Sequence, residues 1–331
     1  MSGNKPIILS GVQPTGQLHL GNYEGALRNW VSLQDDYRMY LCIVDWHSLT
    51  SDFDDTRGMQ DRIYQTVLDF LCSGLDPDKV SIFVQSEVRE HSELHLLLSM
   101  ITPTPWLERV PSYKEKSESL GLDSYGFLGY PLLQAADILL YKADFVPVGK
   151  DQLPHIELTR EVARRFNNLY GEVFPEPDGL LSKFPAIPGT DGRKMSKSYN
   201  NDIKLADSPE ETAKKIKKMI TDPQKVYKGD PGNPEICPVF ALHQIYTDEK
   251  DLAAIDKKCR SGELGCADDK KHLIENLNAS LEPLRKKRKE LEMNKDYVLS
   301  VLDRGAAEAR ERAEATMAEV RKSMNLVRIH A

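Results

Sequence analysis

Short apolar runs typical of β-strands alternate with amphipathic helical segments through the first half of this chain of 331 residues. The expected strands cover residues 7–9, 39–44, 80–84 and 145–148, and the expected helices include residues 56–72 and 151–168. Strands separated by helices predict a parallel sheet covered on both faces, because parallel neighbours need a crossover between them. Ligands of such sheets gather at the carboxyl ends of the strands. A binding site is therefore expected where these strands end.

The chain changes character after this α/β part. Residues 175–192 are rich in proline and glycine, run into a basic loop and are expected to act as a mobile loop or hinge. β signals are few beyond it, and helices are expected at residues 209–220, 270–293 and 297–324. The second part is therefore expected to be a helical bundle. We divide the chain into domains at residues 1–200 and 201–331, with a mobile loop at 189–198.

The composition is that of an ordinary globular protein, with 40% hydrophobic and 29% charged residues. Five cysteines, an odd number scattered along the chain, fit a reducing compartment better than a disulfide framework. Polar residues and Pro6 precede any apolar stretch that could serve as a signal peptide, and no apolar run is long enough to span a bilayer. We expect a soluble cytoplasmic protein.

The net charge of −7 gives no general attraction for a nucleic acid, so such a partner would need a local basic surface. Two stretches qualify, at residues 193–197 and 285–289. Glu282, Glu290 and Glu292 flank the second stretch. A solvated helix face with i,i+4 ion pairs is therefore the alternative interpretation of that stretch.

A loop with glycine and histidine, residues 10–22, follows the first strand and opens a helix. Phosphate groups bind at such junctions because backbone N–H groups at a helix N-terminus point at them. The loop has neither the ending of a P-loop nor the glycine spacing of a dinucleotide fingerprint. Gly21 would let a flat adenine approach the backbone, and His19 and Asn22 can donate to phosphate or ribose oxygens.

A second loop, residues 191–198, carries Lys194, Lys197 and two hydroxyl residues on a flexible connection. Phosphoryl and nucleotidyl transfer need cations that meet the developing negative charge, and a closing loop can deliver them. A solvated basic loop is the alternative by composition alone. Together the two loops favour a site at which ATP binds between them.

Both loops resemble the two signatures of class I aminoacyl-tRNA synthetases, at His19-Leu20-Gly21-Asn22 and at residues 194–198. Further sequence motifs narrow the resemblance to one family, the tryptophanyl-tRNA synthetases. They are Gly11-Val12-Gln13-Pro14-Thr15-Gly16, Asp45-x-His47, Tyr113-Lys114-Glu115-Lys116-Ser117, residues 130–141, Val146-Pro147-Val148-Gly149-x-Asp151-Gln152 and residues 155–160. Their order matches that family over nearly the whole catalytic part. The resemblance implies a Rossmann-like domain followed by a helical anticodon-binding domain.

The resemblance also implies how ATP would be held, with Mg²⁺ accompanying its phosphates. The ATP contacts would be Gln13, Pro14, Thr15, Gly21, Asn22, Gly149, Lys150, Asp151, Ile187, Lys194, Met195, Ser196, Lys197 and Ser198. His19 would steady the phosphates. Lys116, Lys194 and Lys197 would neutralise charge as the carboxylate of tryptophan attacks the α-phosphate and pyrophosphate leaves. No protein nucleophile is required, so catalysis would rest on positioning and electrostatics.

Asp137 would accept the indole N–H of the amino acid. Indole is a donor-only heterocycle with a large apolar body, so an acceptor at the end of an apolar slot rejects isosteres that cannot donate. The resemblance adds His47, Gln152, Val146, Val148, Gln134 and Leu9 to this pocket. Gln134 and Leu9 stand where many relatives carry methionine and phenylalanine, which should alter packing and not specificity. Lys150 stands where many relatives carry an acidic residue.

Three cysteines of the second half resemble an iron–sulfur motif found in some members of the family. Cys237, Cys259 and Cys266 match it, but the position of the fourth ligand is Asp269. Such a cluster usually needs four thiolates, so no stable cluster and no metal held by side chains is expected. Zinc on the cysteines with Asp269 or His272 is disfavoured, because the spacings lack paired Cys-x-x-Cys knuckles.

The activity that the resemblance implies is that of a tryptophan–tRNA ligase, with L-tryptophan and tRNA(Trp) as partners. It also implies a homodimer joined through an insertion at about residues 90–140, and a helical domain that receives the anticodon end, residues 285–289 included. A non-catalytic paralogue and a tyrosyl-tRNA synthetase are the alternatives. An eroded basic loop or a missing Asp137 would favour the paralogue, and neither is found. Ala135-Ala136-Asp137 and Asp45-x-His47 disfavour the tyrosyl enzyme.

Overall fold

A single parallel sheet organises the first half of the protein, whose computed structural model describes residues 5–181, 187–227 and 229–326. Within these residues five strands lie in the order β3-β2-β1-β4-β5. They are β1 (Ile7–Val12), β2 (Arg38–Ile43), β3 (Val80–Val84), β4 (Phe145–Val148) and β5 (Asp178–Leu181). The order reverses between β1 and β4, and this switch point of a doubly wound sheet is its usual ligand site. The predicted α/β fold is confirmed.

Strand β5 escaped prediction from the sequence. It is four residues long and includes an aspartate and a glycine, both depleted in strands. Gly179 is required because a Cβ there would lie 2.8 Å from Cδ2 of Leu153. Close packing against α9, the helix that precedes β5 in the chain, and not local propensity, therefore defines this strand. The neighbouring part of the expected hinge at 182–186, with Pro185, lies outside the described residues.

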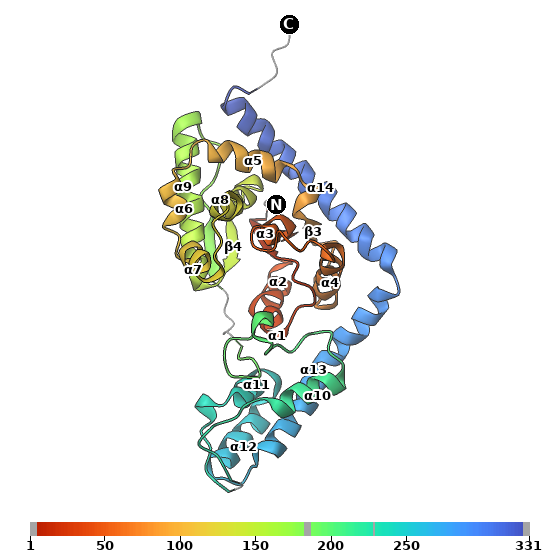
Figure 1. The fold of residues 1–331 in the computed structure, drawn as a ribbon. Helices are drawn as coiled ribbons and strands as arrows, with labels where there is room; N and C mark the ends of the chain where they lie inside the picture. Colours follow the sequence, from red (N-terminus) through yellow and green to blue (C-terminus); the bar gives the residue numbers. More distant parts are fainter. Residues whose placement is uncertain (1–4, 182–186, 228, 327–331) are drawn as a thin grey trace.

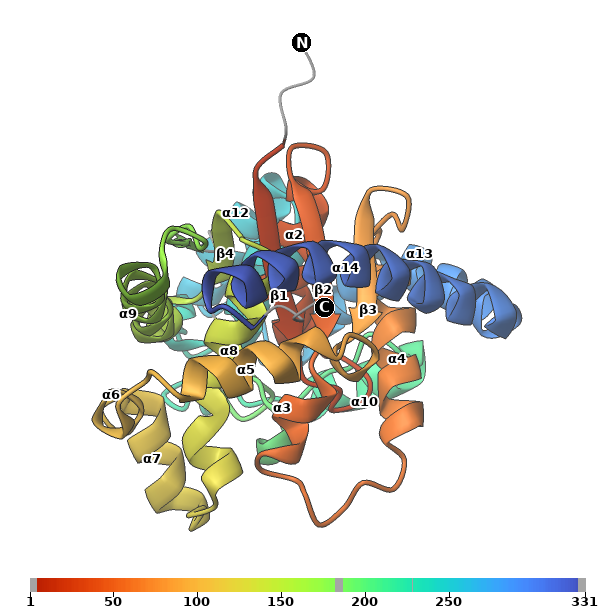
Figure 2. The same cartoon turned by 90° about the horizontal axis from the view of Figure 1, so that it is seen from above.

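Helices cover both faces of the sheet, as the two views in Figures 1 and 2 show. The helices of the first half are α1 (Leu20–Asn22), α2 (Arg28–Leu33), α3 (Asp45–Leu49), α4 (Met59–Cys72), α5 (Glu90–Ser99), α6 (Thr104–Glu108), α7 (Pro111–Leu120), α8 (Tyr125–Leu140) and α9 (Leu153–Tyr170). A π-helical turn, Tyr23–Leu27, joins α1 to α2. Among the described residues, no helix has both the length and the apolar character that a membrane crossing requires.

The second half is helical, as predicted. Its helices are α10 (Pro209–Lys218), α11 (Pro238–Tyr246), α12 (Glu249–Arg260), α13 (Cys266–Glu292) and α14 (Lys295–Ser323). Figure 1 shows α10 to α12 gathered around the first part of α13, below the sheet.

Helix α14 packs on the sheet, a placement that differs from the expected grouping of residues 297–324 with the helical bundle. Figure 2 shows it crossing the strands. Its Ala306, Ala309 and Ala313 are buried in the same apolar cluster as Leu9 and Phe83 of the sheet. A Cβ on Gly305 would lie 1.9 Å from the carbonyl oxygen of Ile82, so the helix approaches the backbone of β3 very closely. This row of small residues explains the packing.

A buried ion pair ties α13 to the first half. Arg288 contacts the carboxylate of Asp69 on α4, and both side chains are buried. The second oxygen of Asp69 accepts the backbone N–H of Leu18 at 2.6 Å, next to His19 of the first loop. Burial raises the pKa of Asp69 to about 6, although Arg288 and the Leu18 N–H act in the opposite direction.

The basic stretch at residues 285–289 is therefore divided between two environments. Arg285 and Arg288 are buried, and a guanidinium nitrogen of Arg285 donates to Oγ1 of Thr212 at 2.8 Å. Lys286, Lys287 and Lys289 are exposed. Neither a wholly solvated face nor a wholly RNA-facing patch describes this stretch, because two of its five side chains hold the domain in place.

Replacing Arg288 with methionine should lower the free energy of unfolding by about 3–5 kcal/mol, since it leaves Asp69 buried without its counter-charge. Chemical denaturation measures the change. The matched control is Lys287→Met on the same helix, whose exposed ammonium only approaches Glu290 at 3.9 Å. That control should cost less than about 0.5 kcal/mol. Equal costs for the two variants would contradict a structural role of the pair.

Candidate active site

The carboxylate of Asp137, on α8, lies buried at the centre of a cluster of hydrogen-bond donors. Its oxygens accept from Nε2 of His47 at 2.9 Å, from Nδ1 of His91 at 2.7 Å and from Nε2 of Gln85, which is 2.9 Å from each oxygen. Burial alone would raise the pKa of Asp137, but His91 and His47 outweigh it and hold that pKa below its ordinary value. Asp137 is therefore an anion that accepts hydrogen bonds.

The ends of the strands explain how these donors meet. His47 lies on α3, directly after β2, and Gln85 directly follows β3. The structure brings Asp137 and His47 together, and their predicted contact with the amino acid remains a prediction. Gln85 and His91 were missed. The position of Gln85 at the carboxyl end of a predicted strand could have indicated it, whereas no pattern marks His91 at the start of α5.

The other expected wall residues lie on the elements around this carboxylate. Leu9 and Val146 are buried in the apolar cluster that also holds α8, and Val148 packs at its edge. Gln134 stands three residues before Asp137 on α8 and is half-buried. Gln152 is half-buried beyond β4, and its Nε2 donates to Oδ2 of Asp151 at 2.9 Å. These placements agree with a slot that ends on Asp137.

His19 caps α1 at the start of the first loop's helix. The ring Nδ1 of His19 accepts the backbone N–H of Asn22 at 3.3 Å. The backbone N–H of His19 donates to Oδ1 of Asn22 at 3.1 Å. Burial and the nearby Lys197 lower the pKa of His19 to about 4. A neutral imidazole whose Nδ1 accepts carries its proton on Nε2. His19 is thus set up as a neutral donor.

Lys197 joins the two loops. Its Nζ donates to the carbonyl oxygen of Thr15 at 3.0 Å and to the Thr15 hydroxyl at 2.9 Å. Burial lowers the pKa of Lys197 to about 8. Residues 203–205, which follow the late loop, also pair with residues 18–20, through Leu20 N–H to Ile203 at 2.9 Å and Leu205 N–H to Leu18 at 2.9 Å. The two loops therefore contact each other, and ATP binding between them remains a prediction.

Gly21 has a reason to be glycine beyond the expected approach of adenine. A Cβ there would lie 2.9 Å from Cε1 of His19 and 3.5 Å from Cβ of Met195, which is buried. The imidazole of His19, in the same loop, leaves no room for a Cβ, whereas the distance to Met195 is an ordinary van der Waals contact. Adenine stacking on this glycine remains a prediction.

Asn201 organises the late loop and was not predicted. Its side chain is buried, accepts the N–H of Ser196 at 2.7 Å and donates to the carbonyl oxygen of Lys194 at 3.2 Å. It also donates to Oδ1 of Asp191 at 2.7 Å. One side chain thus holds three points of the loop. Asparagine next to a basic loop carries no sequence signal that separates this role from an ordinary turn.

The remaining ATP candidates lie around the switch point. Gln13 donates to the carbonyl oxygen of His47 at 3.2 Å, and Pro14 beside it is buried. Gly149, Lys150 and Asp151 are exposed at the end of β4. Ile187 is buried, and its carbonyl oxygen accepts the N–H of Met195 at 3.0 Å. Ser198 is exposed on a short helical turn.

Among the predicted catalytic side chains, Lys116 alone lies outside the two loops. It is exposed on α7, with its Nζ 5.8 Å above the ring of Tyr130. Within the described ranges, no hydrogen bond or ion pair joins it to either loop.

The three C-terminal cysteines are free thiols, with Cys237 buried and Cys259 and Cys266 half-buried. The described part of the chain holds no group of three or more histidine, cysteine or acidic residues arranged to hold a metal ion. Asp269, in the position of a fourth cluster ligand, lies 3.2 Å from Nε2 of His243.

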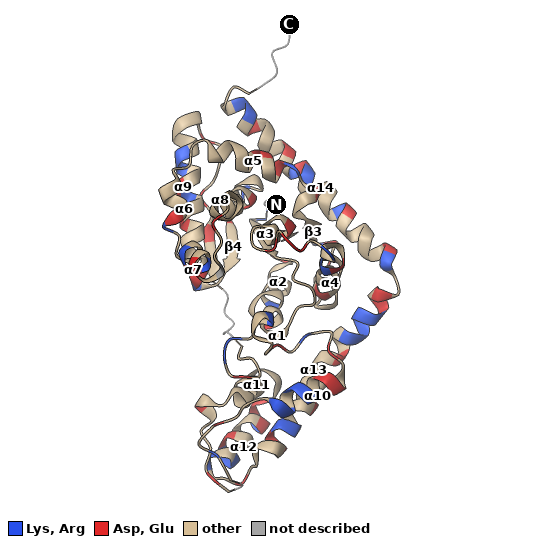
Figure 3. Ribbon diagram, in the orientation of Figure 1, with Lys and Arg blue, Asp and Glu red and all other residues tan. Residues whose placement is uncertain are grey.

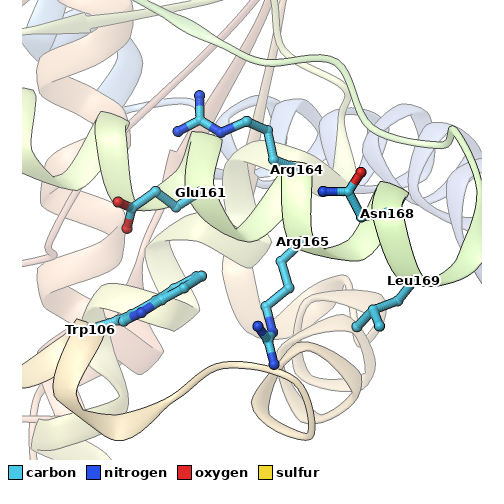
Figure 4. A pocket seen from close by; sticks show the side chains of 6 residues that line it. All are labelled: Trp106, Glu161, Arg164, Arg165, Asn168 and Leu169. Carbon is cyan, nitrogen blue, oxygen red and sulfur yellow. The ribbon is translucent and has the colours of Figure 1, made fainter.

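An open groove of about 450 Å³ lies away from these residues, between α6 and α9 (Figure 4). Trp106, Glu161, Arg164, Arg165, Asn168 and Leu169 line it. Trp106 sits between Arg109 and Arg165, each 5.7 Å from its ring. None of the predicted site residues lines this groove.

Comparison with known proteins agrees with this geometry. The model of the family described as tRNA synthetases class I (W and Y) matches residues 1–282. The tryptophan–tRNA ligase of Thermotoga maritima is 50% identical over 325 residues, which cover 97% of this chain and 99% of that protein. The chain belongs to the tryptophanyl-tRNA synthetases.

Other relatives of this synthetase match it over the same length. The tryptophan–tRNA ligase of Aquifex aeolicus is 44% identical, with 96% of this chain and 99% of that protein covered. The solved tryptophanyl-tRNA synthetase from Campylobacter jejuni, complexed with ADP and tryptophan, has a TM-score of 0.88 and 36% identity over 96% of this chain and 99% of that one. These full-length relatives favour the main interpretation over the tyrosyl alternative.

Replacing Asn201 with alanine should loosen the late loop of the synthetase without unfolding the sheet. The Ser196 amide loses its acceptor, and a hydrogen bond of about 1–1.5 kcal/mol corresponds to about tenfold faster hydrogen exchange. Exchange followed by mass spectrometry checks this. The Leu20 amide, bonded to Ile203 at 2.9 Å outside the loop, is the internal control and should be unchanged. Unaltered exchange at Ser196 would remove Asn201 from this role.

Proposed function

We propose that this enzyme, a tryptophan–tRNA ligase, holds the indole N–H of its amino acid on Asp137 and binds ATP between its two loops. It activates L-tryptophan with ATP, giving tryptophanyl-adenylate and pyrophosphate, and then transfers tryptophan to the 3′ end of tRNA(Trp). The observation that carries the site assignment is a buried, charged carboxylate that accepts hydrogen bonds from His47, Gln85 and His91. It lies on a helix whose apolar residues share a cluster with Leu9 and Val146. Such an acceptor selects a donor-only ring.

The indole would exchange with one of the donors already on Asp137. A carboxylate offers about four acceptor sites, and His47, Gln85 and His91 already use them. Gln85 and His91 are fully buried, whereas 8% of His47 is exposed. We therefore assign the exchange to His47. The solved relative from Campylobacter jejuni, which binds tryptophan and ADP, supports the same pocket by its full-length similarity.

The loops supply what adenylation needs. His19 would offer its Nε2–H to a phosphate oxygen, as the neutral state of its ring allows. Lys197 would leave Thr15 and, with Lys194 and Lys116, face the charge that develops on the departing pyrophosphate. Transfer is in line and needs no protein nucleophile.

Magnesium fits this site through the nucleotide. Mg²⁺ keeps several waters and binds phosphate oxygens together with few protein ligands. When bound, it would neutralise phosphate charge beside Lys194 and Lys197.

The proposal also assigns surfaces to two partners, a second copy of the chain and the tRNA. Leu96, Met100 and Tyr125 expose 55%, 68% and 73% of their surface within the insertion, which supports a homodimer joined there. We assign the anticodon end to α10 and α13, which carry exposed lysines, among them Lys217 and Lys287. Figure 3 shows that basic residues on these helices alternate with acidic ones. The proposal includes a catalytic domain at residues 1–200 and a helical domain at residues 201–331, whose helix α14 packs back on the sheet. It also includes a cytoplasmic location.

Replacing Asp137 with asparagine should abolish selection of tryptophan. The amide loses the charge and turns an N–H₂ group toward neighbouring donors, a loss of about 2–5 kcal/mol or about 30- to 5,000-fold. ATP–pyrophosphate exchange measures this as a fall in kcat/KM for tryptophan, with KM for ATP changed less than about threefold. Thermal melting monitors the fold. A folded variant with unchanged kcat/KM would exclude Asp137 as the selecting residue.

A further inference from the structure

The helix that carries Lys116 is held to the rest of the protein by few contacts. Helix α7 is ten residues long, and none of its side chains at residues 111–119 is buried. A helix of this length is marginal on its own and depends on tertiary contacts for its place. Tyr113 stacks on Phe127 of α8, with ring centroids 5.6 Å apart. The position of Lys116 therefore rests on that stacking and on polar anchors.

The polar anchor is a chain of three side chains from three helices. Oγ of Ser112 on α7 lies 2.9 Å from the hydroxyl of Tyr130 on α8 and 2.8 Å from Nε2 of His155 on α9. Ser112 and Lys116 are four residues apart and therefore share one face of α7. Tyr130 contributes at both points, because the ammonium of Lys116 stands 5.8 Å above its ring.

His155 is unusual for a packing residue. It is 2% exposed, and its Nδ1 is buried without a hydrogen-bond partner among the described residues. Burial, with smaller contributions from Lys116 and His47, lowers the pKa of His155 to about 4, so the ring is neutral. An unpaired buried nitrogen costs about 1–3 kcal/mol, which an apolar ring of the same shape would avoid. The retained imidazole points to a use for its other nitrogen.

We propose that His155 is a positioning residue for adenylation, which holds α7 through Ser112 so that Lys116 faces the reacting phosphates. The ring contacts that of Tyr130 in a tilted arrangement, with centroids 5.7 Å apart and 47° between the planes, while its Nε2 lies at the serine hydroxyl. The inference rests on the role proposed above for Lys116 and adds the side chains that place it. His155 itself touches neither substrate nor the reacting atoms in this account.

Two substitutions separate the nitrogens of His155. The amide of glutamine reaches the position of Nε2, whereas that of asparagine reaches the position of Nδ1. His155→Gln should keep kcat of ATP–pyrophosphate exchange within about threefold of wild type. His155→Asn should lower it by about ten- to a hundredfold, because a misplaced group costs rate more than binding, with KM for tryptophan little changed. The reverse order, with asparagine active and glutamine inactive, would place the function on Nδ1 and overturn the proposal.

A double-mutant cycle tests whether the anchor acts through Lys116. Ser112→Ala should lower kcat about tenfold in the wild-type background and less than about twofold in a Lys116→Ala background. Ser119→Ala is the matched control and should have no effect, because among the described residues the Ser119 hydroxyl bonds only to the carbonyl oxygen of Lys116 within α7, at 3.4 Å. Additive losses would contradict the proposal while leaving Lys116 catalytic. A Lys116→Ala variant with full activity would instead refute the proposed role of Lys116.

Discussion

The hydrogen bonds to the buried carboxylate of Asp137 are the interaction on which the site depends. A charged group without partners in this position would cost several kcal/mol. Its donors come from α3, from the end of β3 and from α5, so satisfying one carboxylate draws together three segments around α8. The histidines beside the carboxylate keep it charged. In the proposed function, the group that holds these segments together would also select the indole N–H.

A second set of contacts sets the other side of the site. Lys197 bridges to Thr15, Met195 packs against the first loop, and Asp69 holds the N–H of Leu18 next to His19. Arg288 of α13 contacts the same aspartate, so the helical half of the chain is anchored one residue away from His19. One buried ion pair thus couples the position of the first loop to that of the helical half. Movement of α13 would change the environment of Asp69 before it changed the sheet.

Prediction from sequence worked where local patterns repeat, and it failed where a single long-range contact determines the role of a residue or strand. The alternation of strands and helices indicated the sheet. Sequence motifs in a fixed order singled out the two loops, Asp137 and His47. Strand β5 was missed because packing against Leu153 overrides the poor strand propensity of Gly179. Gln85, His91 and Asn201 carry no periodic signal, since each is defined by a partner at least five residues away in the chain. The buried Arg288 looked like a solvated cation because its charge, and not its partner Asp69, is visible in sequence.

The most direct test of this account removes the donor from the ligand and leaves the protein unchanged. ATP–pyrophosphate exchange is measured with tryptophan and with its benzothiophene analogue, in which sulfur replaces the indole N–H. A hydrogen bond to a charged acceptor contributes about 1.5–3 kcal/mol, so kcat/KM for the analogue should be about 10- to 150-fold lower. Equal kcat/KM for the two ring systems would contradict the claim that Asp137 selects tryptophan by its N–H.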